Sequence, residues 1–228
     1  LGEPVIRTAV GRAMREMGAQ FVLGETIEAA MKRGAAQEAR GYTYSYDMLG
    51  EAARTEADAQ RYHDAYAAAI RAIAGNATAD ATRDNPGISV KLSALFPRYD
   101  ELQAERARSV LVPRLRALAL QAREAGIGLN VDAEEADRLS LSLDVIEEAL
   151  SDPSLDGWDG FGVVVQAYGQ RAGALIDWLY ALAGQVDRRF MVRLVKGAYW
   201  DTEIKRAQVA GLEGFPVFTS KPATDISY

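Results

Sequence analysis

The chain has 228 residues, enough for one large domain or two small ones, and its 49% hydrophobic and 25% charged residues are ordinary for a globular protein. A formal net charge of −6 argues against a nucleic-acid-binding surface in this part of the chain. The absence of cysteine excludes disulfides, thiolate catalysis and cysteine metal sites, and the single histidine, His63, leaves no His-based zinc site and no obvious Ser-His triad.

Neither a membrane span nor an export signal is visible in the sequence. No apolar run approaches the roughly 20 residues that a spanning helix needs. The N-terminus also shows no charged region followed by an apolar one. We therefore expect a cytoplasmic protein.

Residues 1–41 have the pattern of helices. Apolar side chains recur along one helix face at the 3.6-residue period: Ile6, Val10, Met14, Met17 and Phe21. Gly24 interrupts this pattern, and Thr26 is a suitable N-cap for a second helix that runs through Met31. We expect residues 1–41 to form a helical arm that precedes a separate domain, residues 42–228.

From residue 42 onward, strand patterns alternate with amphipathic helix patterns. Five strands are predicted, at residues 42–46, 88–92, 127–132, 161–166 and 190–195. Strands that alternate with helices in this way predict parallel βαβ units. The Gly-rich fingerprint of dinucleotide-binding sheets does not follow any of the strands.

Three details of the predicted helices depend on single residues. We expect Pro113 in the first turn of its helix, where a missing N–H costs little. A later helix is predicted from Glu134 to Leu150. Asp201 and Thr202 are both suitable N-caps for the last helix.

Every predicted strand ends in a polar or charged residue: Asp47, Lys91, Asp132, Gln166, and the pair Arg193 and Lys196. The active site of a (βα)8 barrel is assembled from such residues at the carboxyl ends of several strands. We therefore predict an α/β fold and prefer a TIM-type (βα)8 barrel, of which about five βα units are visible, over an open sheet.

Three cations near the strand ends have more than one plausible role. A cation within an apolar strand needs an acidic partner or loses its proton. Lys91 is therefore a Schiff-base nucleophile, a cation that binds a carboxylate, or a member of an ion pair. Arg193 and Lys196 either stabilise negative charge on a cofactor or pair with a carboxylate such as Asp132.

The remaining candidates lie next to the strand ends. Gln166 offers a donor and an acceptor for the edge of a heterocycle. Tyr199 and Trp200 either line a site or cover the barrel rim. Glu134 and Glu135 are expected in the first turn of the following helix, where they favour the helix dipole. The sequence therefore assigns these two glutamates a structural role.

Several long segments of the chain carry a family resemblance: GAQFVLGETIEAA, YSYDMLGEAA, ISVKLSAL, VDAEEADRLSLSLDV, VVVQAY and LVKGAYWDTEIKRAQ. Together they resemble the proline dehydrogenase module of bifunctional proline utilization A flavoenzymes, and the resemblance runs through nearly the whole chain. It implies a distorted (βα)8 barrel that holds FAD and oxidises L-proline to Δ1-pyrroline-5-carboxylate, the first step of proline catabolism to glutamate.

The resemblance also implies roles for individual residues. The positions that contact the flavin in the family correspond here to Gln166, Arg193, Val195, Lys196, Gly197, Ala198 and Trp200. The positions that line the proline pocket, and carry the chemistry, correspond to Lys91, Asp132 and Tyr199, with Asp47 and Glu51 near that pocket.

Further partners follow from the same resemblance. It implies a fused aldehyde dehydrogenase domain, a quinone-type electron acceptor and peripheral contact with the inner membrane face in the full-length protein. Phe96 stands where the family usually has a histidine, and Gly169 where a longer polar residue is usual. The family continues past the position of Tyr228 with the remaining strands and a helix that carries an arginine pair. We therefore expect this chain to be part of a larger enzyme and inactive by itself.

Two other hypotheses stay open at this point. The first is a Schiff-base lyase or aldolase on the same barrel, with Lys91 or Lys196 as the amine. The second is a non-catalytic fragment that folds or assembles only with a partner.

Overall fold

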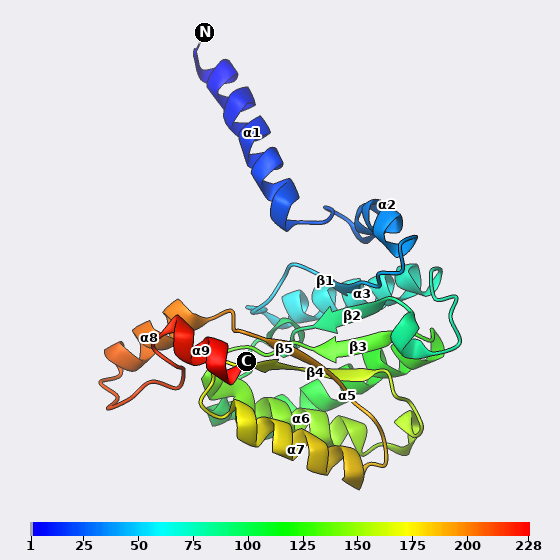
Figure 1. The fold of residues 1–228 in the computed structure, drawn as a ribbon, viewed down its shortest axis with the longest axis vertical. Helices are drawn as coiled ribbons and strands as arrows, with labels where there is room; N and C mark the ends of the chain where they lie inside the picture. Colours follow the sequence, from blue (N-terminus) through cyan, green and yellow to red (C-terminus); the bar gives the residue numbers. More distant parts are fainter. Residues whose placement is uncertain (1) are drawn as a thin grey trace. The chain divides into compact units, whose positions relative to one another are not determined.

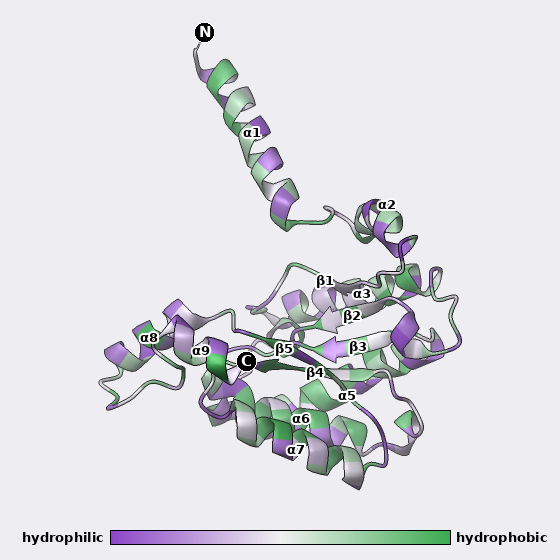
Figure 2. Ribbon diagram, in the orientation of Figure 1, coloured by the Kyte–Doolittle hydropathy of each residue, from purple (hydrophilic) through white to green (hydrophobic). Residues whose placement is uncertain are grey.

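The computed structural model describes residues 2–228, which form two compact units that divide between Tyr44 and Ser45. The unit before this division contains two helices, α1 (Gly2–Phe21) and α2 (Ile27–Glu38). Hydrophobic and hydrophilic residues alternate along α1 in Figure 2, and none of its residues is buried. The functional division into an arm, residues 1–41, and a barrel domain stays a prediction.

The start of α2 is the predicted one. Thr26 is the N-cap, because its side-chain oxygen accepts a hydrogen bond from the Ala29 N–H at 3.2 Å. The helix runs on to Glu38 instead of ending at Met31. Ala30 and Gly34, on one face of α2, are its buried residues, so packing on that face extends the helix.

The second unit is built on a five-stranded parallel sheet with the strand order β1-β2-β3-β4-β5 (Figure 1). Its strands are β1 (Ser45–Asp47), β2 (Gly87–Val90), β3 (Gly128–Val131), β4 (Phe161–Gln166) and β5 (Met191–Val195). Parallel neighbours need a crossover, and the crossovers contain α3 (Glu56–Ala74), α5 (Ala104–Glu124), α6 (Leu139–Leu150) and α7 (Ala172–Gln185). The predicted α/β fold is confirmed, as five consecutive βα units of a TIM-type barrel.

The face of the sheet that packs against the helices forms the hydrophobic core. Side chains from alternate strand positions are buried there: Tyr46, Ile88, Val90, Leu129, Val131, Phe161, Val163 and Val165. The helices contribute apolar stripes, of which α6 is mostly green in Figure 2. Burial at about 25 cal/mol per Å² of apolar surface makes this face the main stabilising feature of the unit.

The opposite face of the sheet is polar, and the strand register aligns its residues in a row. Cα pairing runs from Asp47 to Ser89, then to Asn130, Gly162 and Met191. The glycine in this row makes room for Asn130, because a Cβ at residue 162 would lie 1.8 Å from Oδ1 of Asn130 and would displace that side chain. One face is therefore apolar and the other is shaped for polar side chains.

The predicted position of Pro113 is wrong. α5 begins at Ala104, so Pro113 lies in the helix interior. The same helix buries Leu111, Leu115 and Leu118 against the core, and burial of this stripe outweighs the roughly 3 kcal/mol that an interior proline costs. The proline itself is exposed.

Two other helix starts also differ from prediction. Glu134 is not helical, because a 3-10 turn begins at Ala136 and α6 at Leu139. α8 (Trp200–Val209) has Tyr199 at its N-cap, so Asp201 lies inside the first turn and Thr202 follows it. There the Asp201 carboxylate favours the helix dipole.

Short elements complete the second unit: α4 (Leu92–Leu95), α9 (Lys221–Ser227) and the 3-10 turns Thr82–Asp84, Glu101–Gln103, Ala136–Arg138 and Pro153–Leu155. Among residues 2–228, no helix has both the length and the apolar character to cross a membrane.

Candidate active site

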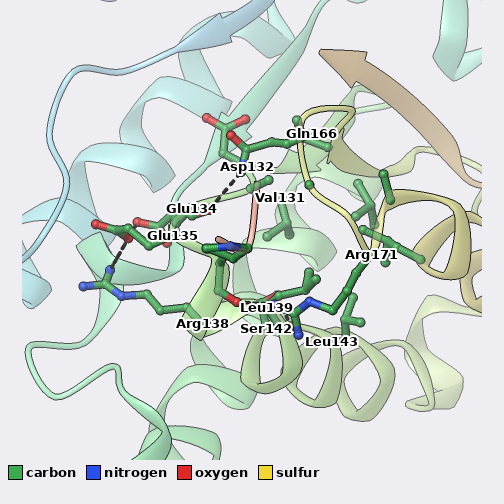
Figure 3. A pocket seen from close by; sticks show the side chains of 18 of the residues that line it. Val131, Asp132, Glu134, Glu135, Arg138, Leu139, Ser142, Leu143, Gln166 and Arg171 are labelled. Carbon is green, nitrogen blue, oxygen red and sulfur yellow. Dashed lines mark hydrogen bonds and ion pairs between the residues drawn. The ribbon is translucent and has the colours of Figure 1, made fainter. Parts of the chain in front are cut away.

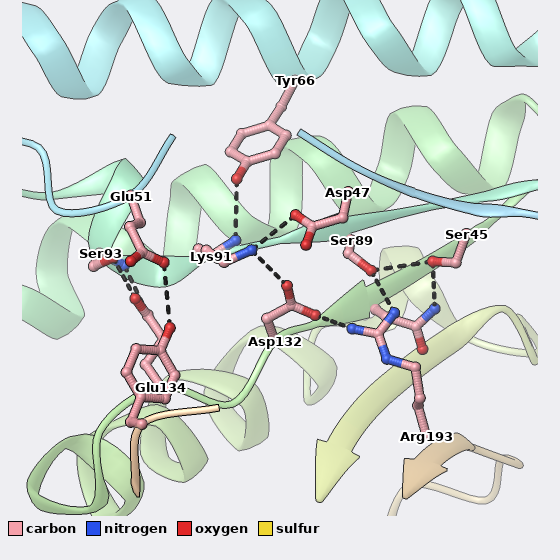
Figure 4. Close-up of polar contacts among 12 residues, drawn as sticks. Ser45, Asp47, Glu51, Tyr66, Ser89, Lys91, Ser93, Asp132, Glu134 and Arg193 are labelled. Carbon is pink, nitrogen blue, oxygen red and sulfur yellow. Dashed lines mark hydrogen bonds and ion pairs between the residues drawn. The ribbon is translucent and has the colours of Figure 1, made fainter. Parts of the chain in front are cut away.

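Lys91 directly follows β2 and lies between carboxylates from the two neighbouring strands. Its Nζ atom donates to Asp47 Oδ1 and to Asp132 Oδ2, both at 2.8 Å (Figure 4). The lysine side chain is 13% exposed and that of Asp132 is 8% exposed. The backbone N–H of Lys91 donates to the hydroxyl of buried Tyr66 at 3.2 Å, so both ends of the lysine are held.

The two carboxylates keep Lys91 protonated. Burial alone would lower the pKa of its ammonium group, but hydrogen bonds and charges from Asp132 and Asp47 outweigh burial and raise the pKa above its ordinary value. A Schiff-base nucleophile needs a neutral amine. The electrostatics of this position therefore favour a cation and disfavour an attacking amine.

Asp132 extends the network to β5. Its Oδ1 atom accepts a hydrogen bond from the guanidinium group of Arg193, whose other terminal nitrogen donates to Ser89 Oγ at 2.9 Å. Ser89 in turn lies 3.1 Å from Ser45 Oγ, which also accepts from Asn130 Nδ2 at 3.3 Å. Side chains from β1, β2, β3 and β5 therefore meet on the polar face.

The charges in this network balance. Asp47 and Asp132 supply two carboxylates, and Lys91 and Arg193 supply two cations. Among the described residues, two acceptors contact the Lys91 ammonium group, which carries three N–H donors. One donor thus remains for a ligand, and the Arg193 side chain is still 37% exposed.

The turn after β5 is held by the loop that follows β4. Gln166 Oε1 accepts from the Ala198 N–H at 3.0 Å, and the hydroxyl of Tyr168 accepts from the Tyr199 N–H at 3.2 Å. Gly197 has a φ of +138° and packs on the Tyr168 ring, where a Cβ would lie 2.4 Å from a ring carbon. Glycine is therefore required for this turn.

Tyr199 is also held at its hydroxyl group. That hydroxyl donates to Glu51 Oε2 at 3.2 Å, which connects the turn after β5 to the loop after β1. Burial first, and then the charge of Glu51, raise the pKa of Tyr199 well above its ordinary value. The phenol therefore stays a hydrogen-bond donor at neutral pH.

Lys196 and Trp200, both expected to contact a flavin, make their contacts outside the network around Lys91. Lys196 forms an ion pair with Asp225 of α9 and lies over the Tyr228 ring, 5.8 Å from its centroid. The indole N–H of Trp200 donates to the Phe218 carbonyl at 2.9 Å. Neither joins the network around Lys91, so their predicted contact with a cofactor stays a prediction, as does that of Val195.

A small cavity lies behind the loop that follows β3 (Figure 3). Its volume is about 60 Å³, and Glu134, Leu139, Gln166 and Arg171 are among the residues that line it. Ligand pockets usually enclose ~300–1,000 Å³, so this cavity has room for a few water molecules only. The candidate ligand site is instead the polar face of the sheet, where the side chains of Lys91, Asp132 and Arg193 meet.

Sequence reasoning missed several members of the site. Ser45, Ser89 and Asn130 each lie two residues before a predicted strand-end residue, so the two-residue period of a strand puts both on one face. That polar alternation was the available signal. Nothing local to the sequence indicated Tyr66 or Tyr168, which reach the site from α3 and from the loop after β4.

The charged side chains gather at the carboxyl ends of the parallel strands, the place where proteins of the α/β-barrel class build their active sites. Residues 30–228 match the proline dehydrogenase family. The chain belongs to this family.

Comparison with single proteins agrees with that assignment. The chain is 56% identical over 227 residues to the bifunctional protein PutA of Salmonella typhimurium. This alignment covers 100% of the chain and 17% of the relative. A crystal structure of a Bradyrhizobium japonicum proline utilization A mutant superimposes with a TM-score of 0.87 at 60% identity, over 100% of this chain and 23% of that one. The structure of proline utilization A from Bdellovibrio bacteriovorus, inactivated by N-propargylglycine, superimposes with a TM-score of 0.90 at 28% identity. The superposition covers 98% of this chain and 24% of that one.

The chain therefore spans less than a quarter of the length of each of these three relatives.

Proposed function

We propose that the protein oxidises L-proline to Δ1-pyrroline-5-carboxylate with FAD, as part of a bifunctional enzyme. The observation that carries this proposal is the Lys91 ammonium group, held between Asp47 and Asp132 with one donor remaining. It offers an amino-acid carboxylate a fixed cation at the carboxyl ends of the strands. Membership of the proline dehydrogenase family supports the choice of substrate.

The reaction removes two electrons from proline. The C5–H bond breaks and its hydrogen leaves with the electron pair as hydride, the ring nitrogen loses a proton, and a C5=N double bond forms. FAD, when bound, supplies the hydride acceptor that no side chain provides. The tasks left for this chain are to bind and orient proline, to exclude water and to hold the charges in place.

Three side chains would share these tasks. Lys91 binds the substrate carboxylate through its remaining N–H donor. Asp132 keeps Lys91 charged and in position, because it accepts one of its hydrogen bonds at 2.8 Å. Tyr199, held at its backbone N–H and at its hydroxyl group, packs against the pyrrolidine ring and sets its orientation.

The donors near the end of β5 fit a flavin. Arg193 presents a partly exposed guanidinium group beside Asp132, which suits the negative charge of a reduced flavin. Lys196 is half exposed and suits a phosphate group. Gln166, the backbone of Val195, Gly197 and Ala198, and the ring of Trp200 complete the proposed contacts with FAD.

The Schiff-base alternative lacks support from the site. Asp132 and Asp47 raise the pKa of Lys91, and a hydrogen bond to Asp225 raises that of Lys196. Both amines are therefore protonated at neutral pH, and a protonated amine cannot attack a carbonyl group.

The remaining partners belong to the full-length protein. We propose that it carries an aldehyde dehydrogenase domain, passes electrons to a quinone-type acceptor and works in the cytoplasm in peripheral contact with the inner membrane face. The Salmonella relative is named a bifunctional protein, which supports the fused domain.

The test uses the full-length protein, purified with its cofactor. Mixed with L-proline without oxygen, it should lose its visible flavin absorption and form an imine that o-aminobenzaldehyde traps. N-propargylglycine, which inactivates the Bdellovibrio relative, should inactivate this protein, and excess L-proline should protect it. A protein that binds flavin but is not reduced by proline would overturn the proposal. Borohydride trapping of a carbonyl substrate on Lys91 would support a lyase instead.

A further inference from the structure

Glu134 is a buried carboxylate whose partners were not expected from the sequence. It follows Asp132 by two residues, and its side chain is only 4% exposed. Ser93 donates to it twice, from the backbone N–H to Oε2 at 3.0 Å and from Oγ to Oε1 (Figure 4). A buried carboxylate is costly unless it is hydrogen-bonded, so the pair of Ser93 and Glu134 joins α4, which follows β2, to the loop after β3.

Ser93 also forms hydrogen bonds with the loop after β1. Its Oγ atom accepts from the Ala52 N–H at 3.0 Å, and its carbonyl oxygen accepts from the Ala53 N–H at 2.9 Å. Ala52 has a φ of +54°, in the left-handed region. A residue with a side chain adopts this conformation at a cost of about 1–3 kcal/mol, and only where its surroundings hold it.

The strained turn presents Glu51. This residue immediately precedes Ala52, and its carboxylate accepts the hydroxyl hydrogen bond of Tyr199. The position of the carboxylate therefore depends on the turn, and the turn is held by the two hydrogen bonds that Ser93 accepts from Ala52 and Ala53.

The other side of Glu134 leads to the turn after β5. Its backbone carbonyl oxygen accepts from Gln166 Nε2 at 2.9 Å, and Gln166 Oε1 accepts from the Ala198 N–H at 3.0 Å. Tyr199 comes next in the chain. Glu134 is thus connected to Tyr199 by two chains of hydrogen bonds. One reaches the backbone beside Tyr199 through Gln166 and Ala198, and the other reaches the hydroxyl group of Tyr199 through Ser93 and Glu51.

We propose that Ser93 and Glu134 are positioning residues for proline oxidation. They hold the strained turn at Ala52 so that Glu51 fixes the hydroxyl group of Tyr199. Neither residue touches the substrate in this proposal. The inference rests on the proposed function, because the assay measures turnover of proline.

The test is a double-mutant cycle in the full-length protein with bound FAD. Ser93→Ala and Glu51→Ala are made singly and together, and kcat, KM for proline, flavin content and thermal midpoint are measured. Ser93→Ala should lower kcat/KM by about tenfold while flavin content is kept. If Ser93 acts through Glu51, the double variant should be no worse than the worse single variant.

Two further variants test the strain and the carboxylate. Ala52→Gly in the Ser93→Ala background should restore part of the lost kcat/KM, because glycine adopts a positive φ without strain. Glu134→Gln should lose less activity than Glu134→Ala, because an amide still accepts from the Ser93 N–H. Ser151→Ala is the control: it removes a serine hydroxyl that donates one hydrogen bond, to the Glu147 carbonyl on α6, and should leave kcat/KM unchanged.

The outcomes separate this inference from the proposed function. If the losses in kcat/KM of the two single variants multiply in the double variant, Ser93 has a purely structural role and the inference is overturned. A Ser93→Ala variant with the same kcat/KM as the Ser151→Ala control would also overturn it. If Ser93→Ala does not fold, the cycle is run with Glu134→Gln, and failure of both to fold would also overturn it. A wild-type protein that binds flavin but does not oxidise proline would instead overturn the proposed function.

Discussion

The Nζ atom of Lys91 lies 2.8 Å from Oδ2 of Asp132, and this contact joins the carboxyl ends of two neighbouring strands. Asp132 contacts Arg193 with its other oxygen, so one carboxylate orients both cations. Buried pairs of this kind are costly to break, because removal of one partner leaves the other uncompensated. The network therefore predicts distinct results for the loss of each member.

Replacement of Lys91 by Met should weaken the use of proline far more than the binding of flavin. The change removes the donor proposed for the substrate carboxylate, at a cost of roughly 2–4 kcal/mol in kcat/KM. Steady-state kinetics with L-proline and the flavin absorbance of the purified variant measure the two effects. Lys205→Met removes an exposed lysine of α8 and serves as the control. An unchanged kcat/KM in the Lys91 variant would contradict the assignment.

Arg193→Met and Asp132→Asn should shift the flavin reduction potential in opposite directions. Loss of the cation disfavours the negative charge of the reduced flavin and lowers the potential, whereas loss of the carboxylate raises it. A shift of ~60 mV in a two-electron couple corresponds to about 2.8 kcal/mol. Potentiometric titration of the full-length variants measures both values. Shifts of the same sign would show that Arg193 does not act on the flavin by its charge.

The stability of the protein should depend on pH through Glu134. Burial raises the pKa of this carboxyl group above its ordinary value, against the opposing hydrogen bonds from Ser93. The folded state then binds the proton more tightly than the unfolded state, so this contribution to stability declines as the pH rises through the interval between the two pKa values. The urea midpoint of Glu134→Gln, relative to that of the wild type, should therefore rise with pH across this interval. A constant difference would exclude the effect.

Pro113→Ala should stabilise the protein. The residue lies exposed in the interior of α5, where proline removes a helical hydrogen bond and crowds the preceding turn. Alanine restores the N–H donor, and we expect a gain of about 1–3 kcal/mol in the free energy of unfolding. Urea unfolding followed by circular dichroism measures it. kcat/KM should not change, since Pro113 belongs to a helix on the apolar side of the sheet and takes no part in the polar network around Lys91. A lower urea midpoint would contradict the prediction.

Much of the fold was predictable because its signals are local. The alternation of strand and helix patterns places β4 at Phe161–Gln166 as predicted, and Thr26 marks the start of α2. Pro113 and Asp201 both have a strong local preference for a helix start, yet each lies inside its helix. For Pro113, burial of the neighbouring leucines extends α5 past it.

The sequence by itself determined which residues end the strands and, through the two-residue period, which of them share the polar face: Asp47, Lys91, Asp132 and Arg193 all follow from it. Only the tertiary structure decided their partners. Lys91 and Asp132 are 41 residues apart, and Arg193 lies 61 residues beyond Asp132. Glu134 has the local pattern of a helix-start residue, yet it turns to Ser93, 41 residues away. Periodicity is a property of neighbouring residues, whereas a buried charge takes its partner from whichever strand the register brings beside it.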